Sequence, residues 1–129
     1  MKKPLLLLMI LTAFLIFTIN LSAQTKVRVK FAKGATLAAL KGVIAGYKYI
    51  DYIVAAKSGQ TMAVNLKATN AACNFYIYYS NEKDVDEASD VKEISRNVDV
   101  DDNYIVRVIL PRSSARRKEK ASFTLNVSI

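Results

Sequence analysis

The segment Gly46–Tyr52, which reads GYKYIDY, holds aromatic and acidic side chains at alternating positions. If the residues between them face the core of a β-strand, then Tyr47, Tyr49 and Asp51 share the opposite side, because side chains alternate along a strand. Tyrosine suits a binding surface because it combines a large rigid ring with a hydroxyl group. The alternative is an ordinary strand face, since strands favour tyrosine in any case.

A second segment, Pro111–Lys120, is basic, with five Lys or Arg residues among the nine from Arg112 to Lys120. Arg112 and Arg116 are four positions apart, so a single helical turn would place both on one face. Arginine is the side chain best shaped to bind a carboxylate with two hydrogen bonds. A solvated basic loop and a nucleic-acid-binding patch are the alternatives. A predicted signal peptide in residues 1–23 and the lack of a known nucleic-acid motif argue against a nucleic-acid-binding patch.

The composition argues against an enzyme. The 129 residues include no His and one Cys, which excludes His-containing triads, His metal sites and an internal disulfide. The lone Cys73 is expected to be a buried strand residue with no base to activate it. A glycosidase needs two carboxylates across a cleft, and nothing in the sequence pairs Asp51 with Glu119. We therefore expect a small binding domain without a cofactor or a metal.

Residues 1–23 are predicted to form a secretory signal peptide. Lys2 and Lys3 precede the apolar run Leu5–Phe17, and Ala23 is a small residue suited to cleavage. A permanent membrane anchor is the alternative, but the apolar run is short for a span of about 20 residues. The mature chain, residues 24–129, then has 106 residues, 17 of them basic and 11 acidic. We expect a soluble periplasmic protein with no membrane contact after cleavage.

The acidic residues concentrate in the middle of the chain. Nine of them lie between positions 81 and 111, and Asn81–Asp90 is expected to be a long solvated loop. A calcium loop is the sharper alternative, because Asp84, Asp86 and Asp90 could supply oxygen ligands. The spacing lacks the glycine and the final glutamate of an EF-hand loop.

The mature chain has the period of two that is typical of half-buried strands. The clearest strands are Thr25–Phe31, Thr61–Ala68, Tyr104–Leu110 and Ala121–Ile129. Less regular ones are Thr36–Ala45, Lys48–Lys57, Cys73–Ser80 and Val91–Arg96. Turns are expected at Lys33–Gly34, Gly46, Ser58–Gln60 and Asp101–Asn103, and a bulge at Gly42. About eight short strands predict one all-β domain, an antiparallel, jelly-roll-like β-sandwich.

Four segments taken in order resemble the periplasmic inhibitors of goose-type (g-type) lysozyme. They are Val27–Gly34, Gly46–Tyr52, Ala56–Met62 and Arg107–Arg116. The second segment and the Arg-x-x-Ala-Arg spacing are the more specific features. The alternating strands alone also occur in other exported sandwiches, such as bacterial pre-peptidase C-terminal domains. The acid-rich stretch Asn74–Val98 departs from the family pattern.

The resemblance implies a β-sandwich that occludes the active-site cleft of a g-type lysozyme. By position, Tyr47, Arg112 and Arg116 match the residues with which the family enters the cleft, and Tyr49, Asp51 and Arg117 are neighbours that we add. Two other functions remain open. A periplasmic glycan- or peptidoglycan-binding module would stack Tyr47, Tyr49 and Tyr52 on sugars, and a basic domain would contact anionic lipid or lipopolysaccharide.

Overall fold

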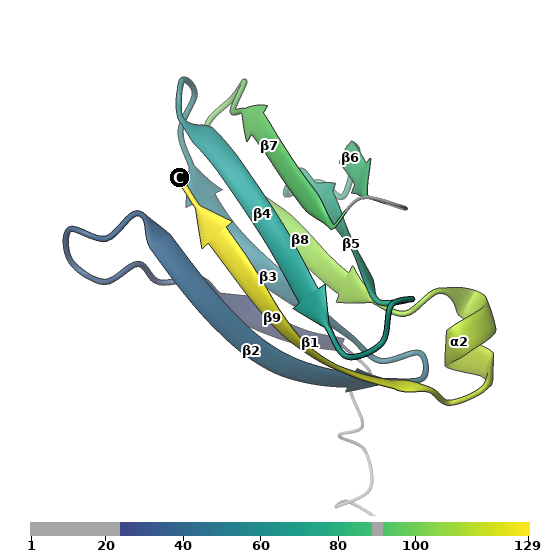
Figure 1. Ribbon diagram of the computed structural model, residues 1–129. Coiled ribbons are helices and arrows are strands. Elements are labelled where there is room, and N and C mark those ends of the chain that lie inside the picture. Colours follow the sequence, from purple (N-terminus) through teal and green to yellow (C-terminus); the bar gives the residue numbers. More distant parts are fainter. Residues whose placement is uncertain (1–23, 89–91) are drawn as a thin grey trace, which may run out of the picture.

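The computed structural model describes residues 24–88 and 92–129, which form two packed β-sheets (Figure 1). The five-stranded sheet has the order β1-β3-β8-β5-β6. Its strands are β1 (Gln24–Arg28), β3 (Tyr49–Ala56), β8 (Asp102–Ile109), β5 (Asn74–Tyr78) and β6 (Asp84–Ala88). The four-stranded sheet has the order β2-β9-β4-β7. Its strands are β2 (Leu37–Ala45), β9 (Lys120–Ser128), β4 (Thr61–Ala68) and β7 (Glu93–Asn97). The predicted β-sandwich is confirmed.

Most neighbouring strands are antiparallel, and the exception among the described residues is β1, which pairs in parallel with β3. Several connections pass from one sheet to the other, and three of them are β2 to β3, β4 to β5, and β8 to β9. All three lie at the same end of the sandwich, because the end of β2 and the start of β9 pair at Ala45 and Lys120, while Ile109 pairs with Asn74. This topology gathers three loops at one end (Figure 1).

The core lies between the sheets and is built from alternating strand residues, as the period of two predicts. Its fully buried members come from both sheets and include Val54, Phe75, Ile77, Val106 and Val108 from one and Met62, Val64, Leu125 and Val127 from the other. Burying a side chain of this size contributes about 1.5–3 kcal/mol relative to leaving it in water. The core therefore fixes which side of each strand faces solvent.

Gly42 does not mark a bulge, and that prediction is wrong. The register between β2 and β9 runs without a shift from Leu37 to Ala45. A Cβ atom at position 42 would lie 2.6 Å from Cζ of Phe123 and 3.0 Å from the hydroxyl oxygen of Tyr52. The Phe123 ring packs edge-on against Tyr52 and occupies the space that a side chain at position 42 would need. Glycine is therefore the residue that fits there without a steric clash.

The acid-rich stretch also differs from expectation. Asp84–Ala88 was expected to lie in a loop but forms β6, which pairs with β5 at the edge of its sheet. Acidic residues suit an edge strand, because charge at the edge of a sheet discourages pairing with strands of other chains. In the described ranges, no group of three Cys, Asp or Glu residues could hold a metal ion. Asp90 of the calcium alternative and the predicted signal peptide, residues 1–23, lie outside those ranges.

Within the same ranges, no helix has the length and apolar character that crossing a lipid bilayer requires.

Candidate functional site

Tyr47 stands at the tip of the connection between β2 and β3. Gly46 has φ of 59°, in the left-handed region that glycine adopts at little cost. The N–H of Lys48 donates to the carbonyl oxygen of Ala45 at 3.2 Å and closes a tight turn. The Tyr47 side chain is 61% exposed, so the turn presents a large ring to solvent.

The connection between β8 and β9 contains the short helix α2 (Arg112–Arg116). Its inner side is anchored, because Ser114 and Ala115 are each only 2% exposed. Arg112 and Arg116, at the first and last positions of the helix, are exposed. The predicted placement of both guanidinium groups on one helical turn is therefore compatible with the structure, and both are directed outward from a buried base.

Local preferences oppose this loop conformation at several points. No side chain caps the helix, and its first turn contains Arg112 but no acidic residue, although helix N-termini favour acids. Lys118 has φ of 57°, a conformation that normally selects glycine. A loop that departs from local stability rules in this way is typical of a functional segment.

The connection between β2 and β3, residues 46–48, is called the Tyr47 turn, and the connection between β8 and β9, residues 110–119, is called the α2 loop. The two are in direct contact. The N–H of Gly46 donates to the carbonyl oxygen of Glu119 at 2.9 Å. The carbonyl oxygen of Ala115 lies 3.7 Å from the position that a Cβ atom of Gly46 would occupy. The structure thus brings together the two segments that the sequence analysis singled out independently.

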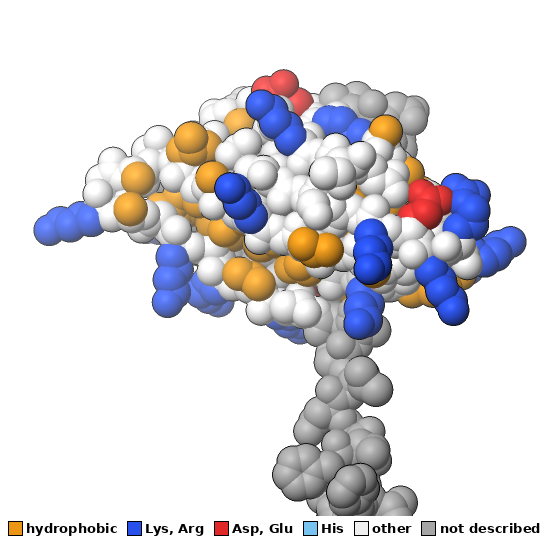
Figure 2. Space-filling model, turned by 60° about the horizontal axis from the view of Figure 1, so that its bottom comes forward, with side chains coloured by type: hydrophobic (Ala, Val, Ile, Leu, Met, Phe, Trp, Pro, Cys, Tyr) orange, Lys and Arg blue, Asp and Glu red, His pale blue; other side chains and the backbone are white. Residues whose placement is uncertain are grey.

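Basic side chains gather at this end of the molecule. In Figure 2, Lys and Arg side chains occur across the face, and several lie together on the right-hand side, which is the end where α2 lies in Figure 1. Residues 112–129 contribute five basic residues and a single acid, Glu119. The surface around Tyr47 is therefore suited to an acidic partner surface.

The three arginines of the loop are not equivalent. Arg117 is held by Glu119, with its Nε and Nη2 atoms each 2.6 Å from Oε2. Within residues 24–88 and 92–129, the guanidinium groups of Arg112 and Arg116 have no hydrogen bond or ion pair. These two groups can engage a partner without breaking a contact of their own, whereas Arg117 cannot.

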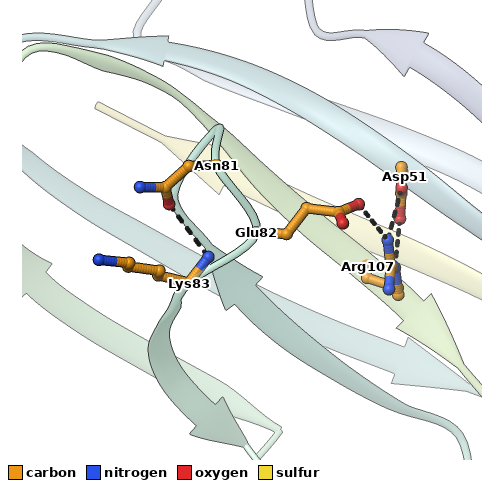
Figure 3. Close-up of polar contacts among 5 residues, drawn as sticks. All are labelled: Asp51, Asn81, Glu82, Lys83 and Arg107. Atoms are coloured by element: carbon orange, nitrogen blue, oxygen red, sulfur yellow. Dashed lines mark hydrogen bonds and ion pairs between the residues drawn. The ribbon is translucent and has the colours of Figure 1, made fainter.

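The prediction that Asp51 is part of an exposed binding surface with Tyr47 and Tyr49 is wrong. The Asp51 side chain is 1% exposed and lies against Arg107, whose Nε and Nη2 atoms donate to its two carboxylate oxygens at 2.7 and 3.0 Å (Figure 3). Glu82 approaches the same guanidinium group at 3.5 Å. The Asp51 contact is the largest of the interactions that raise the pKa of Arg107. Asp51 thus fixes Arg107 and is shielded from a partner.

Tyr49 shares this outer face of the five-stranded sheet and is half-buried. Its ring centre lies 4.5 Å from the Arg107 guanidinium carbon, and the Tyr78 ring centre lies 5.1 Å from it on the same face. Tyr52 faces the core and is only 3% exposed, so it cannot stack on a sugar. Of the three tyrosines in the glycan alternative, Tyr47 is the exposed one.

Two further residues at this end, Asn70 and Glu119, were not among the predicted site residues. Asn70, in the connection between β4 and β5, donates through Nδ2 to Oε1 of Glu119 at 3.0 Å and to the carbonyl oxygen of Lys120 at 3.2 Å. No local pattern announces this contact, because it joins residues far apart in the chain. Cys73 ends the same connection and is buried, as predicted, and burial raises the pKa of its thiol to about 11.

The chain is similar in structure to known lysozyme inhibitors. PliG of Aeromonas hydrophila, a periplasmic lysozyme inhibitor of g-type lysozyme, matches with 33% sequence identity and a TM-score of 0.76, over 81% of this chain and 96% of that one. PliG of Salmonella Typhimurium, which has the same description, matches over the same shares with 24% identity and a TM-score of 0.61.

The fold itself is shared more widely. The pre-peptidase C-terminal domain of a collagenase from Bacillus anthracis matches with 12% identity and a TM-score of 0.57, over 84% of this chain and all of that one. No protein-family model matches the chain, and no curated protein matches it by sequence.

Proposed function

Because this chain belongs to the family of periplasmic inhibitors of g-type lysozyme, we propose that it inhibits a g-type lysozyme by occluding the substrate cleft with Tyr47, Arg112 and Arg116. The inhibition involves no covalent step and no catalysis by this chain. The observation that carries the proposal is the contact between Gly46 and Glu119, which sets the exposed Tyr47 ring beside the α2 loop.

The chemistry of a muramidase cleft complements this surface. Such a cleft contains a general-acid glutamate and further carboxylates. Guanidinium groups inserted there would form charge-assisted hydrogen bonds with these acids and displace water. Arg112 and Arg116 can do so without losing a partner in the part of the chain that the structure describes, and Tyr47 adds a rigid aromatic contact. Arg117, bound to Glu119, and Tyr49, beside Arg107, would lie at the rim.

The attraction between this protein and the lysozyme cleft comes from individual side chains and not from the net charge. The mature chain has an excess of basic residues, 17 against 11 acidic ones, and this net charge by itself does not select a lysozyme cleft. What supports selection is the pair of guanidinium groups of Arg112 and Arg116, which have no partner among the described residues and lie on an anchored loop. We further propose that residues 1–23 direct export and that the protein acts in the periplasm, where it protects peptidoglycan.

The proposal is tested by a cell-wall lysis assay with purified residues 24–129. The protein is titrated against a g-type lysozyme, with chicken-type and invertebrate-type enzymes as controls. Selective inhibition of the g-type enzyme at equimolar amounts is expected. A parallel pull-down with peptidoglycan tests the glycan-binding alternative, in which the protein would sediment without any lysozyme. Sedimentation combined with no inhibition would overturn the proposal.

A further inference from the structure

We infer that Glu119 is a positioning residue for inhibition, which holds the Tyr47 turn, the α2 loop and the connection between β4 and β5 in one arrangement. The inference rests on the proposed function, because it names the group that sets the geometry of the inhibitory surface. Glu119 itself is partly buried, with 29% of its side chain exposed, and it is not proposed to contact the lysozyme.

Glu119 bonds to all three loops. Its carbonyl oxygen accepts from the N–H of Gly46 at 2.9 Å, and its own N–H donates to the carbonyl oxygen of Ser114 at 3.1 Å. Its carboxylate binds Arg117 through one oxygen and Asn70 through the other. Main-chain bonds therefore tie the Tyr47 turn to the helix, and the carboxylate ties the helix to the third loop.

Asn70 is itself rigidly placed, which makes the carboxylate contact directional. Its Oδ1 atom accepts from the N–H of Ala72 at 3.0 Å, while its Nδ2 donates to Glu119 and to the carbonyl oxygen of Lys120. The preceding residue, Thr69, exchanges two hydrogen bonds with Ser122 of β9, at 2.9 and 3.0 Å. The third loop is thus fastened to the sandwich and serves as a fixed support for Glu119.

The carboxylate also sets the charge that the loop presents. Arg112, Arg116, Arg117 and Lys118 lie within one short loop and repel one another, and Glu119 is the single acid among residues 112–129. By neutralising Arg117, it leaves Arg112 and Arg116 as the guanidinium groups available to a partner. A loop ordered before binding loses less conformational entropy on association. Glu119 would therefore strengthen inhibition through the two arginines.

The test compares Glu119→Gln and Asn70→Ala with the unaltered mature protein, with Glu93→Gln as a matched control on an exposed position of β7. Glu119→Gln is expected to weaken inhibition on the order of 10-fold, the equivalent of ordering one or two long side chains. It should also speed hydrogen exchange at the amides of Gly46 and Lys118 in the free protein. Glu93→Gln should change neither quantity.

A second background separates positioning from general destabilisation. If Glu119 acts through Arg116, then Glu119→Gln should weaken inhibition less in a protein that already has Arg116→Ala than in the unaltered protein. If the effects of Glu119→Gln and Arg116→Ala on inhibition are fully additive, the inference is overturned. It is also overturned if Glu119→Gln inhibits as well as an active parent protein. Neither result would overturn the proposed function. An inactive parent protein would overturn the proposed function and with it the role of Glu119 in inhibition.

Discussion

The backbone N–H of Gly46 donates a hydrogen bond to the carbonyl oxygen of Glu119, with an N···O distance of 2.9 Å. This bond joins the turn that exposes Tyr47 to the loop that exposes Arg112 and Arg116. Its consequence is that an aromatic ring and two guanidinium groups form one surface, although they come from distant parts of the chain.

Replacing Tyr47 with alanine should weaken inhibition of the g-type lysozyme by about 2 kcal/mol, close to 30-fold, because a large exposed ring would be lost from the contact. The free energy of unfolding should stay within about 0.5 kcal/mol, since the ring is 61% exposed. Inhibition constants and urea unfolding measure the two effects. Tyr49→Ala is the neighbouring control, and an equal loss in both variants would contradict a specific role for Tyr47.

Replacing Arg107 with alanine should lower the free energy of unfolding by about 3–5 kcal/mol, because it removes the guanidinium group that forms an ion pair with the buried carboxylate of Asp51. Replacing both residues with apolar ones of similar size should cost much less. Arg28→Ala is the control, since Arg28 is exposed and makes one long hydrogen bond, 3.4 Å, to Asn103. Equal unfolding midpoints for Arg107→Ala and Arg28→Ala would refute the role of the ion pair.

Gly42→Ala should destabilise the fold by about 1–3 kcal/mol, because its Cβ would lie 2.6 Å from the ring of Phe123. Combining it with Phe123→Leu should make the added cost of the alanine smaller, since the clashing ring atom is gone. Urea unfolding of the two single variants and the double variant measures this coupling. Additive effects would show that close packing is not the reason for the glycine.

Asp99 should contribute to stability in a pH-dependent way. Tyr79 donates to its carboxylate at 2.7 Å, and the Tyr104 hydroxyl lies 3.2 Å from its other oxygen. These hydrogen bonds, first that of Tyr79, lower the pKa of Asp99 below its ordinary value of 3.8. The stabilisation is therefore complete above the ordinary pKa and is lost as the pH falls through the lower folded-state pKa.

Asp99→Asn should accordingly flatten the loss of stability on acidification below about pH 4. Tyr79→Phe, which removes the main cause of the pKa shift, should act in the same direction. Thermal unfolding between neutral pH and pH 2 checks both variants. A decline as steep as that of the unaltered protein would argue against this contribution.

The strands were predictable because their signals are local. In Thr61–Ala68, for example, apolar residues alternate with polar ones, and β4 has these same bounds. The acidic strand β6 was missed, since its five residues, DVDEA, lack an apolar face and its pairing with β5 depends on the rest of the sheet. Alternation therefore locates strands that have an apolar face, edge strands such as β1 and β2 included, and overlooks an edge strand such as β6 that lacks one.

The exposed residues of the candidate site could be predicted from the sequence, whereas the residues that hold them in place could not. Tyr47 and Arg112 could be found from residue type and spacing, together with the family resemblance. The burial of Asp51 could not, because its partner Arg107 lies on another strand. For the same reason no sequence pattern pointed to Asn70 and Glu119. Contacts that join distant segments become visible only in the folded structure.

The most direct test of the account is the inhibition constant of Arg112→Ala and of Arg116→Ala against a g-type lysozyme. Lys33→Ala, an exposed basic residue in the loop before β2, is the matched control. The account predicts a loss of about 2 kcal/mol or more for each arginine variant, roughly 30-fold, and none for the control. Unchanged inhibition by both arginine variants of an active parent protein would contradict insertion of the α2 loop into the cleft.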